Sequence, residues 1–192
     1  MLPSAPIARM TYPEYVAAEE TATVRHEFID GEVFAMAGGT PGHSALIAAV
    51  IGELRSALLG KPCRVYSSDL RIHIVGTNMS TYPDASVDCG KLDTAPGDPN
   101  AVVNPTLLVE VLSESTEAYD RGAKAAHYRH IESLKEYVFV AQDEPRLEVY
   151  RRTERGGWEL FEARRGEQLG LESIGVSLGV DAVYEGLLES RY

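Results

Sequence analysis

The stretch Leu107-Leu108-Val109-Glu110-Val111-Leu112 decides how the rest of the chain is interpreted. Five of its six residues are leucine or valine, which is typical of a β-strand buried on both faces. The exception, Glu110, would carry a carboxylate into the protein interior. Such a charge is costly unless a cation or a basic side chain pairs with it. The strand therefore predicts a partner for Glu110, either a metal ion or a basic residue.

Two further charged residues lie where they could join Glu110. Asp84 opens another short apolar segment, so a neighbouring strand could bring a second carboxylate close to the first. Two close carboxylates repel each other, which is useful mainly where a metal ion cancels their charge. Lys124 lies on the helix predicted after the Glu110 strand and offers an ammonium group. We therefore expect Asp84, Glu110 and Lys124 to form one site.

Each of these residues also has an ordinary structural explanation. Glu110 could pair with an arginine in the core, and Asp84 could be a turn residue, a common role for Pro-Asp. Lys124 lies four residues after Asp120 and could form a helix-surface ion pair of ~0.3–0.5 kcal/mol. Glu110 just upstream, and Tyr128 one turn beyond Lys124, favour the catalytic interpretation.

The order of these motifs resembles the PD-(D/E)XK nuclease superfamily, in which Pro-Asp on one strand is followed by Glu-x-Lys on the next. Pro83-Asp84 and Glu110 match this pattern, but Leu112 occupies the lysine position, so Lys124 would supply the lysine from the following helix. More specifically, residues 12–183 resemble the restriction endonuclease-like family Uma-two. The ordered residues that carry this resemblance are Glu27, Gly31, His43, Pro83-Asp84, Glu110-Val111-Leu112-Ser113, Asp120, Lys124 and Tyr128.

The resemblance implies a fold, a cofactor and an activity. The implied fold is α/β and restriction endonuclease-like, with a mixed central β-sheet, two main flanking α-helices, and N- and C-terminal β-hairpins. Mg²⁺ or Mn²⁺ would be held by Asp84, Glu110 and the main-chain carbonyl of Val111, which supply the oxygen ligands that hard cations take. Lys124 would assist the attacking water, and Glu27 would complete the site. The implied activity is metal-dependent cleavage of DNA by a homodimer.

Two other functions stay open at this point. The chain could be a catalytically silent module for binding or assembly on the same fold, as Leu112 and the acidic composition would allow. It could also be a metal-dependent hydrolase of a smaller phosphate substrate, which would need no basic groove.

Composition sets the outer limits. A chain of 192 residues, 44% of them hydrophobic and 24% charged, suits a single domain over 1–192 with its core at about 12–185. The net charge of −11 opposes binding to DNA, so a nuclease needs a local basic surface. The residues available for such a surface are Arg121, Arg129, Arg151, Arg152, Arg155, Arg164 and Arg165.

The same composition indicates a compartment. No apolar run is long enough to cross a membrane, and the first residues lack the pattern of a signal peptide. We therefore expect a cytoplasmic protein without a membrane partner, in which Cys63 and Cys89 are reduced thiols.

Local patterns predict most of the secondary structure. Asp30-Gly31 predicts a hairpin, the segment 91–104 is expected to be a mobile surface loop, and Arg71 and His73 should lie on a solvent-exposed strand face. The predicted helices begin at Thr11, span His43–Leu59, run from about Ser113 to Ser133, and span Asp181–Leu188. The predicted strands are His26–Met36 as a hairpin, Arg64–Tyr66, Leu70–Val75, Glu136–Ala141, the hairpin Arg146–Arg152 with Trp158–Ala163, and one near Ile174.

Overall fold

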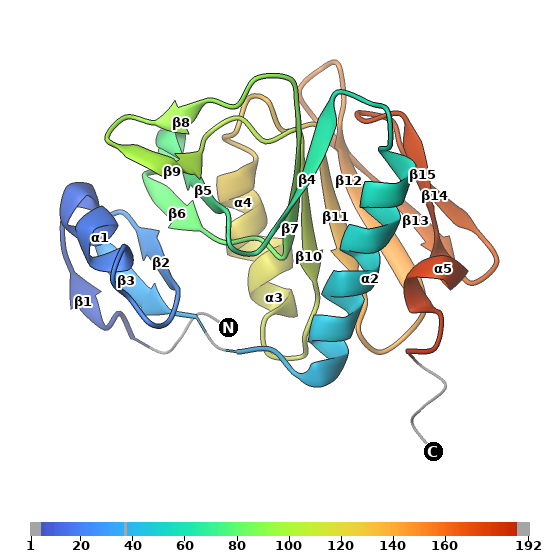
Figure 1. The fold of residues 1–192 in the computed structure, drawn as a ribbon, viewed down its shortest axis with the longest axis horizontal. Helices are drawn as coiled ribbons and strands as arrows, with labels where there is room; N and C mark the ends of the chain where they lie inside the picture. The colour runs from blue at the N-terminus through green and yellow to red at the C-terminus, as the bar shows by residue number, and fades with distance from the viewer. Residues whose placement is uncertain (1–4, 37, 188–192) are drawn as a thin grey trace.

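The computed structural model describes residues 5–36 and 38–187, and these form two mixed β-sheets with few helices (Figure 1). The first sheet contains, in spatial order, β1 (Ala8–Arg9), β3 (Glu32–Ala35), β2 (His26–Ile29), β6 (Met79–Thr81), β5 (Arg71–Ile74), β9 (Asp98–Val102) and β8 (Thr94–Ala95). The second contains β13 (Trp158–Arg164), β12 (Arg146–Arg152), β11 (Glu136–Val140), β10 (Leu107–Val111), β7 (Ala85–Cys89) and β4 (Cys63–Ser67). The strands β14 (Gln168–Leu171) and β15 (Val176–Gly179) form a separate hairpin.

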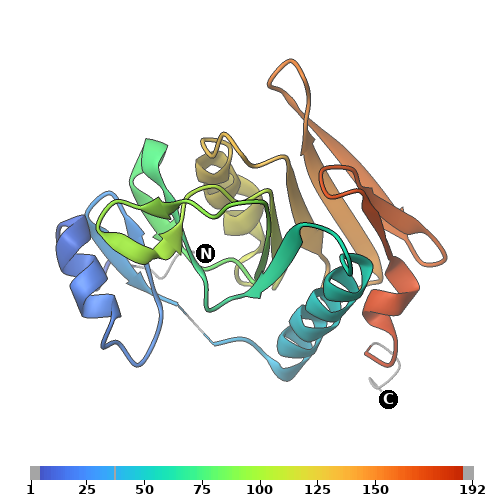
Figure 2. The same ribbon diagram turned by 45° about the horizontal axis from the view of Figure 1, so that its top comes forward.

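Helices cover both faces of the six-stranded sheet (Figures 1 and 2). The long helix α2 (Pro41–Ala57) packs on one face, and a helical segment that follows β10 packs on the other. That segment is α3 (Glu117–Tyr119), the π-helical η2 (Asp120–Lys124) and α4 (Ala125–Tyr128). The remaining helices are α1 (Tyr12–Glu19), the short 3₁₀ turn η1 (Val75–Thr77) and α5 (Val180–Tyr184). The mixed central sheet with a helix on each face agrees with expectation, whereas the separate seven-stranded sheet was not predicted.

Strand β10 lies inside the six-stranded sheet and is buried along its whole length. It runs parallel to β11 and antiparallel to β7. Leu107, Val109 and Val111 pack in the core beneath α2, while Leu108 packs with the helical segment on the other face. Because side chains alternate along a strand, Glu110 faces the same side as Leu108. The pattern read from the sequence is therefore correct, and it directs the Glu110 carboxylate toward α3, η2 and α4.

Turn chemistry accounts for the N-terminal hairpin of β2 and β3. Asp30 and Gly31 both adopt positive φ, at 45° and 94°, as a two-residue turn of the Asp-Gly type requires. The predicted hairpins at this turn and between β12 and β13 are confirmed.

The segment 91–104 is not the expected mobile loop. It contains β8 and β9, which pair with each other, and β9 also pairs with β5. Its residue Asp98 is fully buried and accepts hydrogen bonds from Arg71. The expectation that Arg71 and His73 lie on a solvent-exposed face of β5 is also wrong, because these residues are only 4% and 6% exposed. His73 is enclosed by its hydrogen-bonding contact with Ser80 and by the ring of Tyr12.

The prediction of two reduced cysteines is also wrong. Cys63 and Cys89 form a disulfide. Strands β4 and β7 are antiparallel, and their register places these two residues directly opposite each other, with Cα atoms 4.1 Å apart. The register of the two strands therefore accounts for the disulfide.

Several element boundaries differ from the prediction. Helix α2 begins at Pro41 because Thr40 accepts a hydrogen bond from the His43 N–H and caps it. The helical segment after β10 ends at Tyr128 rather than near Ser133. Ile174 lies in the turn between β14 and β15, and α5 ends at Tyr184; Leu188 lies outside the described residues.

Candidate active site

The centre of the site is an ion pair between Glu110 and Lys124. The Lys124 Nζ atom lies 2.7 Å from Oε1 of Glu110, and both residues are only 4% exposed. The same ammonium lies 3.6 Å from a carboxylate oxygen of Glu27 and 3.7 Å from one of Asp120. One lysine therefore faces three carboxylates. Three of the predicted site residues, Glu27, Glu110 and Lys124, are brought together in this cluster.

Glu27 reaches the cluster from the other sheet. It lies on β2, and its carboxylate accepts hydrogen bonds from the hydroxyl groups of Thr81 and Tyr119, the latter at 2.9 Å. The site is therefore formed where the two sheets meet. Thr81 and Tyr119 were not predicted, because Tyr119 is 92 positions away from Glu27 and nothing in the local sequence links them.

The π-helical η2 places two residues of the cluster on one buried face. Asp120 begins η2 and Lys124 ends it, and both side chains are buried. Tyr128, one turn further, donates a hydrogen bond of 2.9 Å from its hydroxyl to Glu110. Short π-helical stretches are frequent at functional sites. The sequence interpretation that put Tyr128 on the same face as Lys124 is correct.

Asp84 and Val111 form the more open end of the site. Asp84 Oδ2 accepts a hydrogen bond of 2.8 Å from the Val111 N–H. The Nε2 atom of His43 lies 2.9 Å from the Val111 carbonyl oxygen and 3.4 Å from Asp84 Oδ2. The side chains of Asp84 and His43 are 16% and 17% exposed, against 5% for Glu110. Solvent therefore reaches the site from the side of Asp84 and His43.

No role in the site was predicted for His43, although it stands in the order of residues that carries the resemblance. Thr40 is the cap, and the His43 imidazole points at the site instead. Its partner Val111 lies 68 positions away, so only the position of His43 among the ordered residues could have signalled the contact.

The excess of negative charge shifts several pKa values. Burial raises the pKa of Glu110 well above its usual range, and the charge of Lys124 offsets this only in part. Burial also raises the pKa of Asp120. Burial opposes the charge of Lys124, but Glu110, Glu27 and Asp120 outweigh it and raise the lysine pKa. The hydrogen bond to Asp84 raises the pKa of His43, which favours a charged imidazolium beside Val111.

Residues 12–181 match the family Uma2, described as "Putative restriction endonuclease". The chain belongs to the Uma2 family. Two relatives are uncharacterized proteins of Synechocystis sp.. One is 38% identical over 185 residues, which is 96% of each chain, and the other is 33% identical over 153 residues, 80% of this chain and 86% of the relative.

A solved structure has a similar fold. It is the crystal structure of a putative nuclease belonging to DUF820 from Anabaena variabilis, with a TM-score of 0.73. The alignment covers 95% of this chain and 100% of the other at 18% sequence identity, so the likeness concerns the fold. The resemblance to Uma-two seen in the sequence is thus confirmed.

The expected metal ligands of this Uma2 protein can be tested against the structure. Within the described ranges, no three side chains of the types His, Cys, Asp or Glu are grouped as metal ligands. The expected set needs only two carboxylates, because its third oxygen is the Val111 carbonyl. The imidazole of His43 already lies beside that carbonyl and Asp84, so a positively charged group is accommodated there. By donor type and by charge, Asp84, Glu110 and Val111 fit a hard divalent cation.

Some of the arginines expected to meet DNA are engaged by glutamates in this Uma2 protein. Three of them each pair with two carboxylates: Arg121 with Glu117 and Glu148, Arg151 with Glu136 and Glu172, and Arg164 with Glu144 and Glu162. Among the described residues, Arg129 and Arg152 have no such ion pair and bond to main-chain carbonyls instead. Three of the seven expected arginines are therefore already neutralised by carboxylates, which reduces the positive charge available to a polyanion.

A cleft of about 760 Å³ adjoins the open end of the site. One end of the cleft is lined by Thr40, which caps the helix that carries His43, and by Leu112, which follows Val111. From there the cleft extends over Glu114, Asp143 and Arg146. Its size would admit part of a substrate, but three of the four charged side chains on its walls are acidic. A phosphate could approach here only if a cation compensated that charge. No helix in the described part of the chain is long and apolar enough to cross a membrane.

Proposed function

We propose that this protein is an endonuclease that hydrolyses DNA phosphodiester bonds with the help of Mg²⁺ or Mn²⁺. The observation that supports it most is the charge imbalance at the buried ion pair. Glu27, Glu110 and Asp120 share the single ammonium of Lys124, and Asp84 lies beside them. A protein retains such a repulsive cluster chiefly where a cation balances it.

The residues divide into those that would hold the ion and those that would assist the reaction. Asp84, Glu110 and the Val111 carbonyl would hold the cation, which when bound polarises a phosphoryl oxygen and lowers the pKa of a coordinated water. Lys124 would hold the attacking water or balance charge that develops on the phosphate. Glu27 fixes the ammonium from the opposite sheet and is itself fixed by Thr81 and Tyr119.

A catalytically silent binding or assembly module is the second candidate. It is favoured because two of the expected metal ligands already have hydrogen-bonding partners within the protein. Asp84 accepts a hydrogen bond from the Val111 N–H, and the Val111 carbonyl contacts His43. The three acidic side chains on the walls of the adjoining cleft favour it as well.

Cleavage assays separate these two functions. The protein should nick or cut plasmid and single-stranded DNA in Mg²⁺ or Mn²⁺, and Asp84→Ala should not. The matched control is Asp93→Ala, because Asp93 is an exposed aspartate whose ion pair with Lys91 lies at the surface. No cleavage by the parent protein under any of these conditions would favour the silent module.

The role of Lys124 has its own test. Lys124→Ala should lose cleavage while its affinity for Mn²⁺ stays near that of the parent, because the lysine is not an expected metal ligand. Lys91→Ala is the control, since that side chain is 91% exposed. Cleavage by Lys124→Ala at the parental rate would show that Lys124 serves only as an ion-pair partner.

We also propose a homodimer. One site per chain cuts both strands of a duplex most simply as a two-fold pair, and such pairs are the commonest protein assembly. Light scattering at micromolar concentration should give twice the monomer mass of 21.0 kDa, and the monomer mass itself would contradict the proposal.

A further inference from the structure

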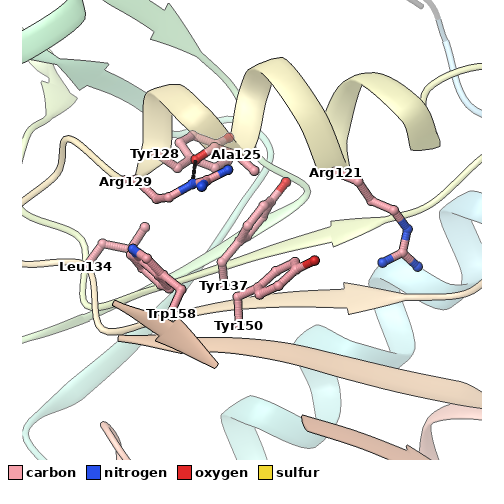
Figure 3. Close-up of a pocket in the computed structure, with 8 residues that line it drawn as sticks. All are labelled: Arg121, Ala125, Tyr128, Arg129, Leu134, Tyr137, Tyr150 and Trp158. Carbon is pink, nitrogen blue, oxygen red and sulfur yellow. Dashed lines mark hydrogen bonds between the residues drawn. The ribbon is translucent and has the colours of Figure 1, made fainter. Parts of the chain in front are cut away.

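A cavity of about 170 Å³ lies directly behind the active site, between the helical segment α3–η2–α4 and strands β11, β12 and β13 (Figure 3). One water molecule needs only about 10–15 Å³ of such space, so the cavity has room for a small ring-shaped ligand. Six of the residues that line it carry aromatic rings or guanidinium groups: Tyr128, Tyr137, Tyr150, Trp158, Arg121 and Arg129.

The aromatic walls are held by the sheet. Tyr137 and Tyr150 are opposite each other on β11 and β12, and Figure 3 shows their side chains side by side below the helix. Trp158 on β13 is covered by the guanidinium of Arg152, which lies 4.7 Å from its ring centre. Arg152 is in turn fixed by hydrogen bonds to the carbonyl groups of Arg129, Ile131 and Leu134. Walls of this kind offer fixed aromatic surfaces to a flat ring.

The two ends of the cavity differ in charge. Figure 3 shows Arg129 at the same end as Trp158, and Arg121 at the other end. Arg121 is neutralised by Glu117 and Glu148. Arg129 is exposed, donates a hydrogen bond to the Ala125 carbonyl, and has no ion-pair partner among the described residues. In a chain with a net charge of −11, this end is therefore the one suited to an anionic group.

The cavity and the active site share a side chain. The ring of Tyr128 lines the cavity, while its hydroxyl donates to Glu110 at 2.9 Å. Tyr137 likewise lines the cavity and donates to the carbonyl oxygen of Asp120. A ring bound in the cavity would thus be separated from the carboxylate cluster by one layer of tyrosines.

We propose that this cavity binds one nucleobase of an unpaired nucleotide, with the ring against Trp158 and Tyr150 and a phosphate of the same nucleotide at Arg129. Aromatic side chains bind bases of any sequence because every base has a π-face, and arginine adds to such sites. A base can enter a pocket only from a single strand or after leaving its duplex. The inference rests on the proposed nuclease function and deepens it, because it names an unpaired nucleotide as the feature recognised.

Trp158 provides a direct measurement, because it is the only tryptophan in the chain. Its fluorescence is followed in EDTA, where no metal-dependent cleavage can occur, during titration with adenosine monophosphate, ribose 5-phosphate, a short single-stranded DNA and the same DNA as a duplex. We expect a saturable change with adenosine monophosphate and with the single strand. Ribose 5-phosphate should give none, and the duplex should bind at least about ten-fold more weakly than the single strand.

Variants show whether the ligand lies in the cavity. Tyr150→Ala and Arg129→Ala should each weaken binding of the single strand by about ten-fold. Arg129 is exposed, so its replacement leaves the fold intact even if Tyr150→Ala does not fold. Phe161→Ala is the control, because Phe161 is a partly exposed ring on β13 that packs against Arg151 and does not line the cavity.

The outcomes are distinct. No fluorescence change, an equal response to ribose 5-phosphate, equal binding of duplex and single strand, or unchanged binding by both Tyr150→Ala and Arg129→Ala would each overturn the inference. Tighter binding of the strand than of the mononucleotide identifies a strand as the source of the base, and equal binding identifies a free nucleotide. Nucleotide binding without any cleavage in metal would refute the nuclease alone, whereas cleavage without a Trp158 response would refute the cavity alone.

Discussion

Two buried charge clusters of the molecule differ in a way that separates structure from function. In the seven-stranded sheet, Arg71 donates to both carboxylate oxygens of Asp98 at 3.0 and 2.8 Å, and the hydroxyl of Tyr12 donates to Asp98 at 2.8 Å. The remaining guanidinium nitrogen donates to Tyr82. One positive charge meets one negative charge, and the hydrogen bonds are satisfied. The second cluster, around Lys124, has three carboxylates for one ammonium.

The pKa values follow this difference. Burial opposes ionisation of Asp98, but the hydrogen bonds from Arg71 and Tyr12 outweigh it and lower the pKa of Asp98. Burial raises the pKa of Glu110, and Lys124 does not compensate fully. In the balanced cluster the charges already cancel. In the unbalanced cluster the negative charges are neutralised only when another cation binds. A buried charged residue therefore indicates a functional site less strongly than a buried cluster whose charges do not cancel.

The largest expected effect is on metal binding. Asp84→Ala and Glu110→Ala should each abolish binding of Mn²⁺ at the main site, because each removes a ligand and part of the negative charge that attracts the ion. Asp98→Asn changes the balanced cluster and should leave the affinity unchanged. Calorimetric titration measures all three variants. If both Asp84→Ala and Glu110→Ala bind Mn²⁺ with the affinity of the parent, the proposed metal site is wrong.

The next effect is on stability and concerns the balanced cluster. Arg71→Met should lower the free energy of unfolding by about 3–5 kcal/mol, because it leaves Asp98 buried without its partner. Arg9→Met is the control, since Arg9 is 77% exposed and pairs with Glu32 at the surface. Urea unfolding followed by circular dichroism measures both. A loss for Arg71→Met as small as that for Arg9→Met would mean that the Asp98 pair is not structural.

The sequence predicts those features of the unbalanced site that depend on local sequence patterns. A run of leucine and valine marks β10, Asp-Gly marks the first hairpin, and Glu110 stands out because it interrupts an apolar strand. Lys124 could be placed near Glu110 because the helix follows the strand directly.

The balanced cluster could not be read in this way, because its partners come from distant segments. Asp98 lies where Gly97, Pro99 and Asn100 resemble a loop, and only pairing of β9 with β5 buries it against Arg71. The contact of His43 and the disulfide depend likewise on packing and on strand register. Local chemistry thus indicated the unbalanced site, while long-range pairing decided the rest.

The buried carboxylate of Asp88, which belongs to neither cluster, extends the comparison because neither of its oxygens has a hydrogen-bond partner among the described residues. Burial raises the pKa of Asp88 to about 7, compared with ~3.9 in an unfolded chain. Between these pH values the unfolded chain is ionised and the folded protein still binds the proton, so stability falls as pH rises. The fall stops above about pH 7.

Asp88→Asn removes this titration and should flatten that part of the pH profile. From pH 4 to pH 8 its stability should gain about 2–4 kcal/mol relative to the parent. Chemical unfolding at several pH values measures the difference. Asp93→Asn, which changes an exposed aspartate, should follow the parental profile. A constant difference between Asp88→Asn and the parent across this range would show that Asp88 ionises normally in the folded protein.

The smallest and most discriminating effect is expected for Glu110→Gln. The folded pKa of Glu110 is raised, so its ionisation costs stability as pH climbs above its unfolded value of ~4.3. Glutamine keeps the shape and removes one charge, while Lys124 retains Glu27 and Asp120 as partners. In EDTA at neutral pH the variant should therefore be more stable than the parent by about 1 kcal/mol.

Added Mg²⁺ should reverse this order. A ligand that binds the folded protein stabilises it by RT ln(1 + [L]/Kd), and the variant, which lacks one carboxylate ligand, gains less than the parent. Thermal melting of both proteins, in EDTA and in millimolar Mg²⁺, measures the reversal. The balanced cluster supplies the control: Asp98→Asn should be less stable than the parent in both conditions, because Arg71 loses its counter-charge. If Glu110→Gln is also the less stable protein in EDTA, then Glu110 is a structural partner of Lys124 in the same sense as Asp98 is of Arg71. The difference between the two clusters would then carry no information about function.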